Sequence, residues 1–392
     1  MPQIPAGWKE TTLGEVVEFI DWDRGKNYPN WDDFKTTWFC VFLNAKNLPN
    51  RIFDFSETMF ISEEKDLILR KGKLKRWDYV MTTRWTIGNF AYYNDQVVYS
   101  NMRINSWMVI IRAYKDLINE KFLWLFFSSN IFKYYLSWFT SWSAVPQLPI
   151  KDIKQLPILL PPLPEQQAIA AVLSSFDDKI ELLRAENQTL EQMGQELFKE
   201  RFCKWKIGDE LPEGWRVGKL GEEITPKQGK YIDAKYISDN QNDIHKYPIY
   251  WGSWIRGYVR TFDYSNPMTI LTCRWNWCGL IQFTERYSTI TNSCMVFDSE
   301  TVWLSSERIY LRSKNINFES VISGSAQPQI TISSLFNVSI VVPDQETLSK
   351  FDLVIKPLFN KIRANSEQIQ TLSSARDQLL SKLMSWEVRV EF

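Results

Sequence analysis

The sequence has little of what catalysis and cofactor binding usually require. It contains one histidine, His245, in 392 residues, which nearly excludes Ser-His-Asp or Cys-His catalysis and histidine-based metal sites. A Walker-type phosphate loop, a Gly-x-Gly-x-x-Gly fingerprint and the Asn- or Asp-Pro-Pro-aromatic motif of amino-methyltransferases are all missing. We therefore expect a chain that is not an enzyme and that holds no cofactor or metal.

Signals for membrane insertion, export and disulfide bonds are absent too. No run approaches the roughly 18 consecutive apolar residues of a membrane span, and the N-terminus lacks a basic start followed by an apolar stretch. The five cysteines show neither disulfide nor zinc spacing. These absences predict a cytoplasmic protein with reduced thiols.

An excess of charge of either sign is also lacking. Lysine plus arginine and aspartate plus glutamate number 46 each, whereas a protein that binds nucleic acid by electrostatics is usually strongly basic. Any surface that binds anions must therefore arise from local clusters of charge.

What the sequence does contain is a long internal repeat. Pro-x-Gly-Trp followed by Leu-Gly-Glu occurs at 5–15 and again, offset by 207, at 212–222. Ser-Ala-x-Pro-Gln occurs at 143–147 and again, offset by 182, at 325–329. The two offsets make the second copy about 25 residues shorter between its markers. The repeat predicts a pseudo-symmetric molecule, and such molecules usually bind something that also comes in two parts.

Each copy ends in a segment with heptad periodicity. We expect long helices from 165 to about 203 and from about 344 to 385, each of roughly 39 residues and so roughly 58 Å long. Packing the two seams together would bury both, and one Asn in each would fix the register; a generic dimerisation arm explains the periodicity as well. The seam residues that we single out are Phe176, Ile180, Leu190, Leu358, Ile362 and Leu372.

The remaining halves, 1–145 and 204–330, have short aromatic and β-branched runs between turn residues, which predicts a mixed α/β domain with a small twisted sheet in each. Basic side chains gather in their turns. Arg can pair bidentately with guanine, and Lys and Arg also hold phosphates without reading sequence; for any single residue a solvated surface charge is the alternative. The candidates for DNA binding are Arg24, Lys26, Lys71, Lys73, Arg84, Arg103, Lys227, Lys230, Arg256 and Arg274.

The start of the first long helix carries a family resemblance. The chain reads LPPLPEQQAI at 160–169 and FDDKI at 176–180, which resembles the region between the two domains of type I restriction–modification specificity subunits. The two pairs of repeated markers look like that family's domain starts and ends. The resemblance covers essentially the whole chain.

The resemblance implies two target-recognition domains, 1–160 and 204–342, each reading half of a bipartite sequence in double-stranded DNA. Helices in 161–203 and 343–392 would form an antiparallel coiled coil that sets the unread spacer. Such a subunit has no activity of its own; it docks two adenine methyltransferase subunits, then two restriction subunits that use ATP, and directs methylation and cleavage. A coiled-coil scaffold that binds proteins or glycans through two sensor-like domains is the alternative.

Tryptophan stands where this family is expected to have glycine, at Trp77, Trp85, Trp107 and Trp386. The repeat agrees, because Trp142 matches Gly324 at the offset of 182. Glycine typically makes up about 7% of residues, or roughly 27 here, but the chain has 15 Gly beside 18 Trp. Because Trp cannot adopt positive φ without strain, we hypothesise that some of these codons are UGA, read as glycine in the source organism; a Trp-rich protein is the alternative.

Overall fold

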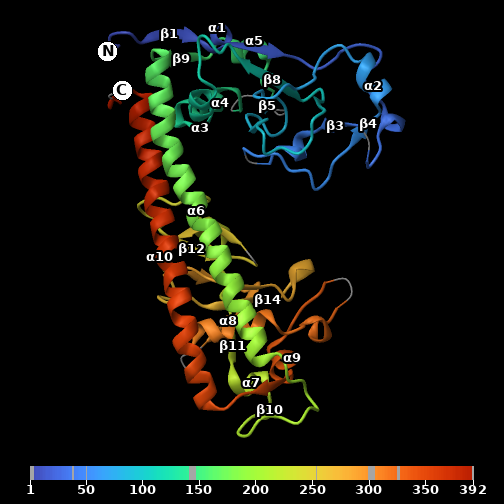
Figure 1. Cartoon of the computed structure of the whole chain (residues 1–392), viewed down its shortest axis with the longest axis vertical. Helices are drawn as coiled ribbons and strands as arrows, with labels where there is room; N and C mark the ends of the chain where they lie inside the picture. Colours follow the sequence, from blue (N-terminus) through green and yellow to red (C-terminus); the bar gives the residue numbers. More distant parts are fainter. Residues whose placement is uncertain are drawn as a thin grey trace. The chain divides into compact units, whose positions relative to one another are not determined.

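The computed structural model describes residues 4–37, 39–49, 51–140, 147–252, 254–298, 305–324 and 327–390. The chain divides into two compact units (Figure 1): unit 1 comprises Met1–Glu181 and Gln370–Phe392, and unit 2 comprises Leu182–Ile369. Each unit contains a globular part and one end of each of two long helices. No helix in the described ranges is long and apolar enough to cross a membrane.

Unit 1 contains three small β-sheets. A two-stranded antiparallel sheet pairs β1 (Lys9–Thr12) with β9 (Pro157–Leu160). An antiparallel four-stranded sheet has the order β2-β8-β5-β6, and a three-stranded sheet has the order β4-β3-β7 with β3 and β7 parallel. The strands of these two sheets are β2 Val17–Ile20, β8 Met108–Ala113, β5 Tyr79–Thr82, β6 Phe90–Tyr92, β4 Phe60–Ile61, β3 Cys40–Leu43 and β7 Met102–Ile104.

Short helices connect these strands and close the core of unit 1. In α3, the side chain of Asn119 accepts hydrogen bonds from the N–H groups of Lys121 and Phe122, so the helix starts with a satisfied cap. The aromatic face of α3 then packs with Tyr79 of the four-stranded sheet in one core cluster. The helices of unit 1 are α1 Leu13–Val16, η1 Trp31–Asp33, η2 Ala45–Asn47, α2 Glu63–Ile68, α3 Glu120–Ser128, α4 Asn130–Thr140 and α5 Ile150–Lys154.

Unit 2 repeats this strand arrangement. It has a two-stranded sheet of β10 and β18, a four-stranded sheet in the order β11-β17-β14-β15, and a three-stranded sheet in the order β13-β12-β16 with β12 and β16 parallel. Its strands are β10 Arg216–Lys219, β11 Thr225–Gln228, β12 Tyr247–Tyr250, β13 Ile255–Val259, β14 Thr269–Thr272, β15 Ile281–Phe283, β16 Thr289–Ile290, β17 Cys294–Asp298 and β18 Ser339–Val342. Its helices are α7 Leu220–Glu223, η3 Ala234–Tyr236, η4 Trp275–Trp277, α8 Ser306–Lys314, η5 Glu319–Val321 and α9 Ile332–Phe336. The predicted mixed α/β fold, present twice, is confirmed.

The first repeated marker anchors each unit to the start of a long helix. In unit 1 the Trp8 indole N–H donates to Glu165 over 3.1 Å, and in unit 2 the Trp215 indole N–H donates to Asp344 over 3.1 Å. The glycine before each Trp has positive φ, +87° at Gly7 and +80° at Gly214, which glycine adopts without strain. The Gly-Trp pair thus sets both the turn and the anchor.

The two long helices, α6 (Leu163–Phe202) and α10 (Gln345–Met384), pack together, and they run side by side in Figure 1. Within unit 1, Arg376 forms an ion pair with Asp177 at 2.6 Å. Within unit 2, the side chain of Asn365 donates to those of Glu186 and Asn187 over 2.9 Å each. Pairing of a late residue of one helix with an early residue of the other makes the pair antiparallel, so the packing expected from the seams is confirmed.

The seam residues lie at this helix pair with different degrees of burial. Ile180 is buried at 3% exposure. The buried Asn365 and its partner Asn187 are the two seam asparagines, and their hydrogen bond fixes the helix register in unit 2. The other singled-out seam residues are half-buried: Phe176, Leu190, Leu358, Ile362 and Leu372.

Tryptophan occupies left-handed backbone positions in both units. Among the described residues other than glycine, six have positive φ, and four of them are tryptophan: Trp77 (76°), Trp85 (64°), Trp275 (65°) and Trp386 (52°). Three of these were expected from the sequence; Trp107 does not have positive φ, and Trp142 lies outside the described residues. Its repeat partner Gly324 has φ of +88°. A bulky side chain at positive φ is strained, so the backbone supports the hypothesis of glycine at those four positions.

Candidate nucleic-acid interface

Three turns of unit 1 meet at the end of β5. The N–H of Thr83 donates to the carbonyl of Trp107 over 2.7 Å, and the N–H of Leu148 donates to the carbonyl of Thr83 over 2.9 Å. Between them Arg84 forms an isolated antiparallel bridge with Gln147, the last residue of the Ser-Ala-x-Pro-Gln marker. Arg84 is half-buried and Gln147 is exposed.

The same three turns meet in unit 2 at the end of β14. The N–H of Cys273 donates to the carbonyl of Ser293 over 2.9 Å, and the N–H of Ile330 donates to the carbonyl of Cys273 over 3.0 Å. Arg274 forms the matching antiparallel bridge with Gln329, and both residues are exposed. We refer to Arg84 with Gln147 and Arg274 with Gln329 as the two Arg–Gln bridges.

The Arg–Gln bridges connect two sequence patterns that looked independent. Sequence reasoning singled out Arg84 and Arg274 but read Gln147 and Gln329 only as domain-end markers. Both glutamines occupy the same place in the repeat, at the offset of 182, and that shared position was the available signal.

One of the ten basic candidates, Arg103, is buried and forms interactions within unit 1. Its side chain is 6% exposed and pairs with Asp66, and its other guanidinium N–H groups donate to the carbonyls of Asp66, Leu69 and Lys71 over 2.7–2.9 Å. Lys73 also binds Asp66. Burial alone would raise the pKa of the Asp66 carboxyl, but hydrogen bonds from Lys73 and Arg103 hold it below its usual value. Arg103 therefore has a structural role, because it fastens the α2 segment to strand β7; contact of Arg103 with DNA stays a prediction that its burial disfavours.

The other basic candidates of unit 1 are at the surface. Arg24 is 71% exposed in its side chain and pairs with Asp21 at 2.7 Å. Lys26 and Lys71 are exposed and form no ion pair with the residues that the structure describes. Within the described ranges, Lys26 and Lys71 thus have no carboxylate partner, whereas Arg24 and Lys73 pair with Asp21 and Asp66.

The basic candidates of unit 2 differ in the interactions that their side chains make. Lys230 pairs with Asp263 at 2.5 Å, which raises the pKa of its ammonium group. Arg256 is exposed on β13, with its guanidinium 5.6 Å from the ring centre of Trp251. Lys227 is exposed and lines a cavity between the sheets and α10.

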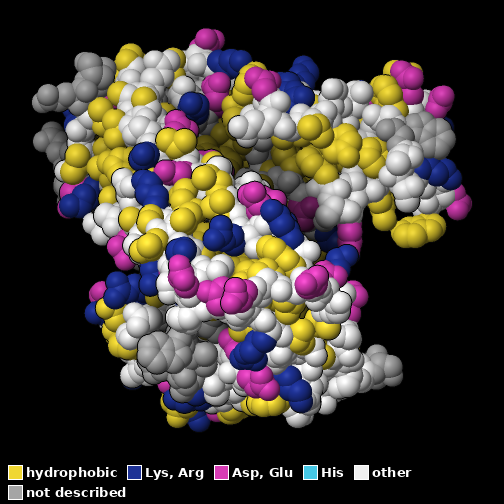
Figure 2. All heavy atoms as spheres, turned by 60° about the horizontal axis from the view of Figure 1, so that its bottom comes forward, with side chains coloured by type: hydrophobic (Ala, Val, Ile, Leu, Met, Phe, Trp, Pro, Cys, Tyr) yellow, Lys and Arg dark blue, Asp and Glu magenta, His cyan; other side chains and the backbone are white. Residues whose placement is uncertain are grey.

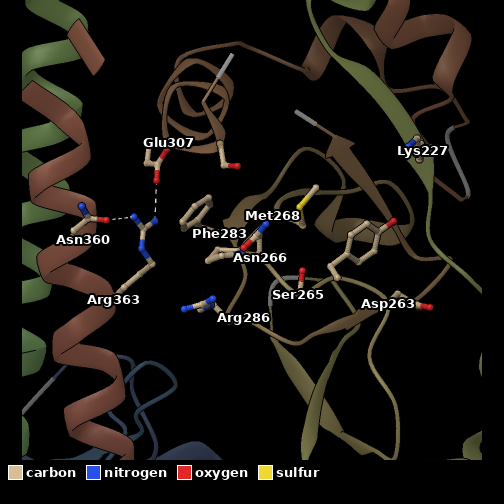
Figure 3. A pocket seen from close by; sticks show the side chains of 13 residues that line it. Lys227, Asp263, Ser265, Asn266, Met268, Phe283, Arg286, Glu307, Asn360 and Arg363 are labelled. Atoms are coloured by element: carbon tan, nitrogen blue, oxygen red, sulfur yellow. Dashed lines mark hydrogen bonds and ion pairs between the residues drawn. The ribbon is translucent and has the colours of Figure 1, made fainter. Parts of the chain in front are cut away.

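This cavity, of about 580 Å³, is polar and has mixed charge (Figure 3). On one side Arg363 of α10 is held by Glu307 at 2.8 Å and by Asn360. Lys227 and Asp263 lie on the other side in Figure 3. The lining includes Lys227, Arg286 and Arg363 beside the carboxylates Asp263 and Glu307, so cations and anions are mixed within the same cavity.

Charge is also mixed on one face of the surface. On the face drawn in Figure 2, lysine and arginine side chains lie interspersed with aspartate and glutamate.

A groove of about 610 Å³ beside the bridge of unit 2 includes Gln228, Arg274, Gln329 and Thr331 in its lining. The Gln228 amide there donates to the carbonyls of Asn292 and Cys294 over 2.6 and 3.1 Å.

Comparison with known proteins gives one consistent answer. Residues 5–192 match the family model described as the type I restriction modification DNA specificity domain. The chain is 29% identical to the type I restriction enzyme MjaIX specificity subunit of Methanocaldococcus jannaschii over 308 residues, covering 71% of each chain. It is 21% identical to the MjaVIII specificity subunit of the same organism, over 99% of this chain and 95% of that one.

A solved structure shares the fold. The type I restriction–modification S subunit from M. genitalium superposes with a TM-score of 0.53 at 14% identity, covering 100% of this chain and 98% of that one. The repeated topology, the long helix pair and the sequence matches agree with the resemblance at the helix start. Over essentially its whole length this chain is therefore similar to type I restriction–modification specificity subunits, and residues 5–192 match the DNA specificity domain of such proteins.

Proposed function

We propose that this chain recognises a bipartite sequence in double-stranded DNA as the non-catalytic specificity subunit of a type I restriction–modification complex in the cytoplasm. The observation that carries this proposal is the duplication itself. Two units have the same strand order, and each presents an Arg–Gln bridge on equivalent turns. A protein that presents one surface twice suits a target with two parts.

The proposal divides the chain by role. Residues 1–160 and 204–342 would be the two target-recognition domains, and the helices within 161–203 and 343–392 would be the arms of the spacer. The division into compact units cuts across both helices, as expected if each recognition domain rests on its own end of the helix pair.

The partners in this proposal are two methyltransferase subunits and restriction subunits that use ATP. We propose the helix pair of unit 2 as a docking surface, because its helices expose the apolar residues Met193, Leu353 and Val354, at 47%, 77% and 52%. A contiguous patch of exposed apolar side chains is typical of interaction surfaces. The even balance of charge predicts weak DNA binding by the chain alone and strong binding in the complex.

The test is to map methylated adenines in the source genome and then to footprint the reconstituted methyltransferase complex on a duplex with the mapped site. We expect two short protected segments separated by unread bases. If no bipartite site is protected, the proposal fails. Specific capture of a protein or glycan without DNA protection would instead favour the scaffold alternative.

A further inference from the structure

We infer that the two Arg–Gln bridges hold backbone phosphates at equivalent positions of the two half-sites, and that they do not read bases. The inference rests on the proposed function and deepens it. It assigns Arg84 and Arg274, each beside its glutamine, to positioning the DNA, and it leaves base reading to the segments in which the two units differ.

The geometry of each bridge suits a phosphate. Residues directly opposite each other in an antiparallel pair project from the same face, with Cβ atoms about 5 Å apart. A guanidinium fork and a carboxamide N–H₂ can therefore reach the same phosphate in both units. Arginine matches the oxygens of a phosphate through two parallel hydrogen bonds, and the neighbouring carboxamide can donate a further one.

The two arginines also have no carboxylate partner in the part of the chain that the structure describes. Neither Arg84 nor Arg274 forms an ion pair with the described residues, whereas Lys73, Arg103 and Lys230 are all paired with Asp66 or Asp263. A cation already paired with a carboxylate gains less from a phosphate, because the existing interaction must first be broken. Among the candidates without a carboxylate partner in the described residues, Arg84 and Arg274 are the two that occupy equivalent bridges in both units.

The decisive point is that the bridges are the same while their surroundings differ. Beside the bridge of unit 2, the last residue of β11 is Gln228, whose amide is hydrogen-bonded to the turn. In unit 1 the residue after β2 is Asp21, which accepts from Arg24. A feature common to both units cannot tell two half-sites apart. The sugar–phosphate backbone is the part of DNA that is the same at every site.

The experiment uses the complete complex with methyltransferase subunits and a duplex that carries the site mapped by methylation. Binding of the wild type, Arg84→Ala and Arg274→Ala is measured against potassium chloride concentration, for the mapped site and for single-base variants of each half-site. We expect each substitution to reduce the slope of log K against log [salt] by about 0.9. Affinity for the mapped site and its variants should fall by one common factor, so that the mapped methylation sequence is unchanged.

Two further variants guard against loss of folding and general charge effects. Arg274→Lys keeps the charge without the fork, and should restore the slope while recovering only part of the affinity. Lys350→Ala removes one charge from an exposed helical pair with Glu346, and should leave the slope unchanged. An equal loss of slope in Lys350→Ala would overturn the inference, since net charge alone would then explain the effect.

The inference is also overturned if Arg274→Ala leaves the slope unaltered. It is equally overturned if that variant loses discrimination at one base pair of one half-site, by about fivefold to 150-fold, because that is the signature of base reading. Failure of the proposed function looks different: the wild-type complex would show no preference for the mapped site over its variants.

Discussion

The two units share a scaffold and differ in what is attached to it. Their strand orders correspond one to one, and the three-residue turns at 105–107 and 291–293 have the same length. By contrast, residues 44–59 join β3 to β4 in unit 1, where only residues 251–254 join β12 to β13 in unit 2. Likewise, residues 62–78, which include α2, join β4 to β5 in unit 1, and the equivalent connection in unit 2 is the shorter 260–268. The second copy is thus shorter in the connections to the strands of its three-stranded sheet, whereas the strands of its four-stranded sheet correspond to those of unit 1.

The longer connection at 62–78 in unit 1 has interactions of its own that stabilise it. Cys40, Phe42, Ile61 and Leu69 form a small buried core, and Asp66 pairs with both Arg103 and Lys73. Unit 2 has Thr289-Ile290 in β16, the strand that corresponds to β7, and therefore no arginine there. A longer connection between the same strands requires its own interactions to stay ordered, and in unit 1 a buried ion pair supplies them.

The largest expected effect comes from changing the spacer. One heptad inserted into each long helix beside the Asn187–Asn365 pair adds about 10 Å, which is about three base pairs at 3.4 Å each. If the two units are independent readers, binding to the original site should be lost, while mapping of methylated bases should show unchanged half-sites with a longer spacer. Altered half-site bases with an unaltered spacer would contradict this view of the repeat.

The next effect is on the stability of unit 1. Arg103→Ala leaves the buried Asp66 with Lys73 as its remaining ion-pair partner, and breaking a buried ion pair costs about 3–5 kcal/mol. We expect a large fall in the free energy of unfolding, measured by denaturant titration with a probe in unit 1. Lys71→Ala, which removes an exposed charge from the same segment, should have almost no effect.

One outcome would contradict the structural role of Arg103. If it contacted DNA directly, its replacement would leave the unfolding curve unchanged and lower only DNA affinity.

These residues show what the sequence can and cannot predict. Heptads and repeated markers predicted the helix pair and the two-fold repetition of the α/β fold, because both are local or periodic patterns. The burial of Arg103 depends on Asp66, and the bridge of Arg84 depends on Gln147; both pairings join residues far apart in the chain. One local signal for Arg103 was available, since Met102 and Ile104 flank it with apolar residues in a buried strand.

A moderate effect is expected in the connection that only unit 1 has. Lys46 and Glu57 form an ion pair there at 2.7 Å, with side chains 76% and 71% exposed. Exposed pairs of this kind contribute about 0–1 kcal/mol to stability, so Lys46→Ala should fold normally. If 44–59 reads bases, the variant should change preference at one position of the first half-site by about 1–3 kcal/mol, measured by competition with single-base variants. A change in the second half-site instead would contradict the assignment of this connection to the first.

The smallest effect concerns the residue after each bridge arginine, where the two units agree again. Trp85 and Trp275 have φ of 64° and 65° and are 64% and 51% exposed, so their rings gain little from burial while their backbones are strained. A residue other than glycine in this region costs about 1–3 kcal/mol, partly offset by the freedom that glycine adds to the unfolded chain. Trp85→Gly and Trp275→Gly should therefore each stabilise the protein by about 1 kcal/mol.

The matched control is Trp107→Gly, at a position without positive φ and 37% exposed. Glycine there relieves no strain and only loosens the unfolded chain, so stability should fall. If Trp85→Gly and Trp275→Gly destabilised the protein as Trp107→Gly does, left-handed geometry would not explain the excess of tryptophan. Mass spectrometry of the native peptide across 77–85 then decides the codon reading, because glycine at 77 and 85 with tryptophan retained at 8 and 215 would mean that the two units share a Gly turn after the bridge arginine as they share the bridge itself.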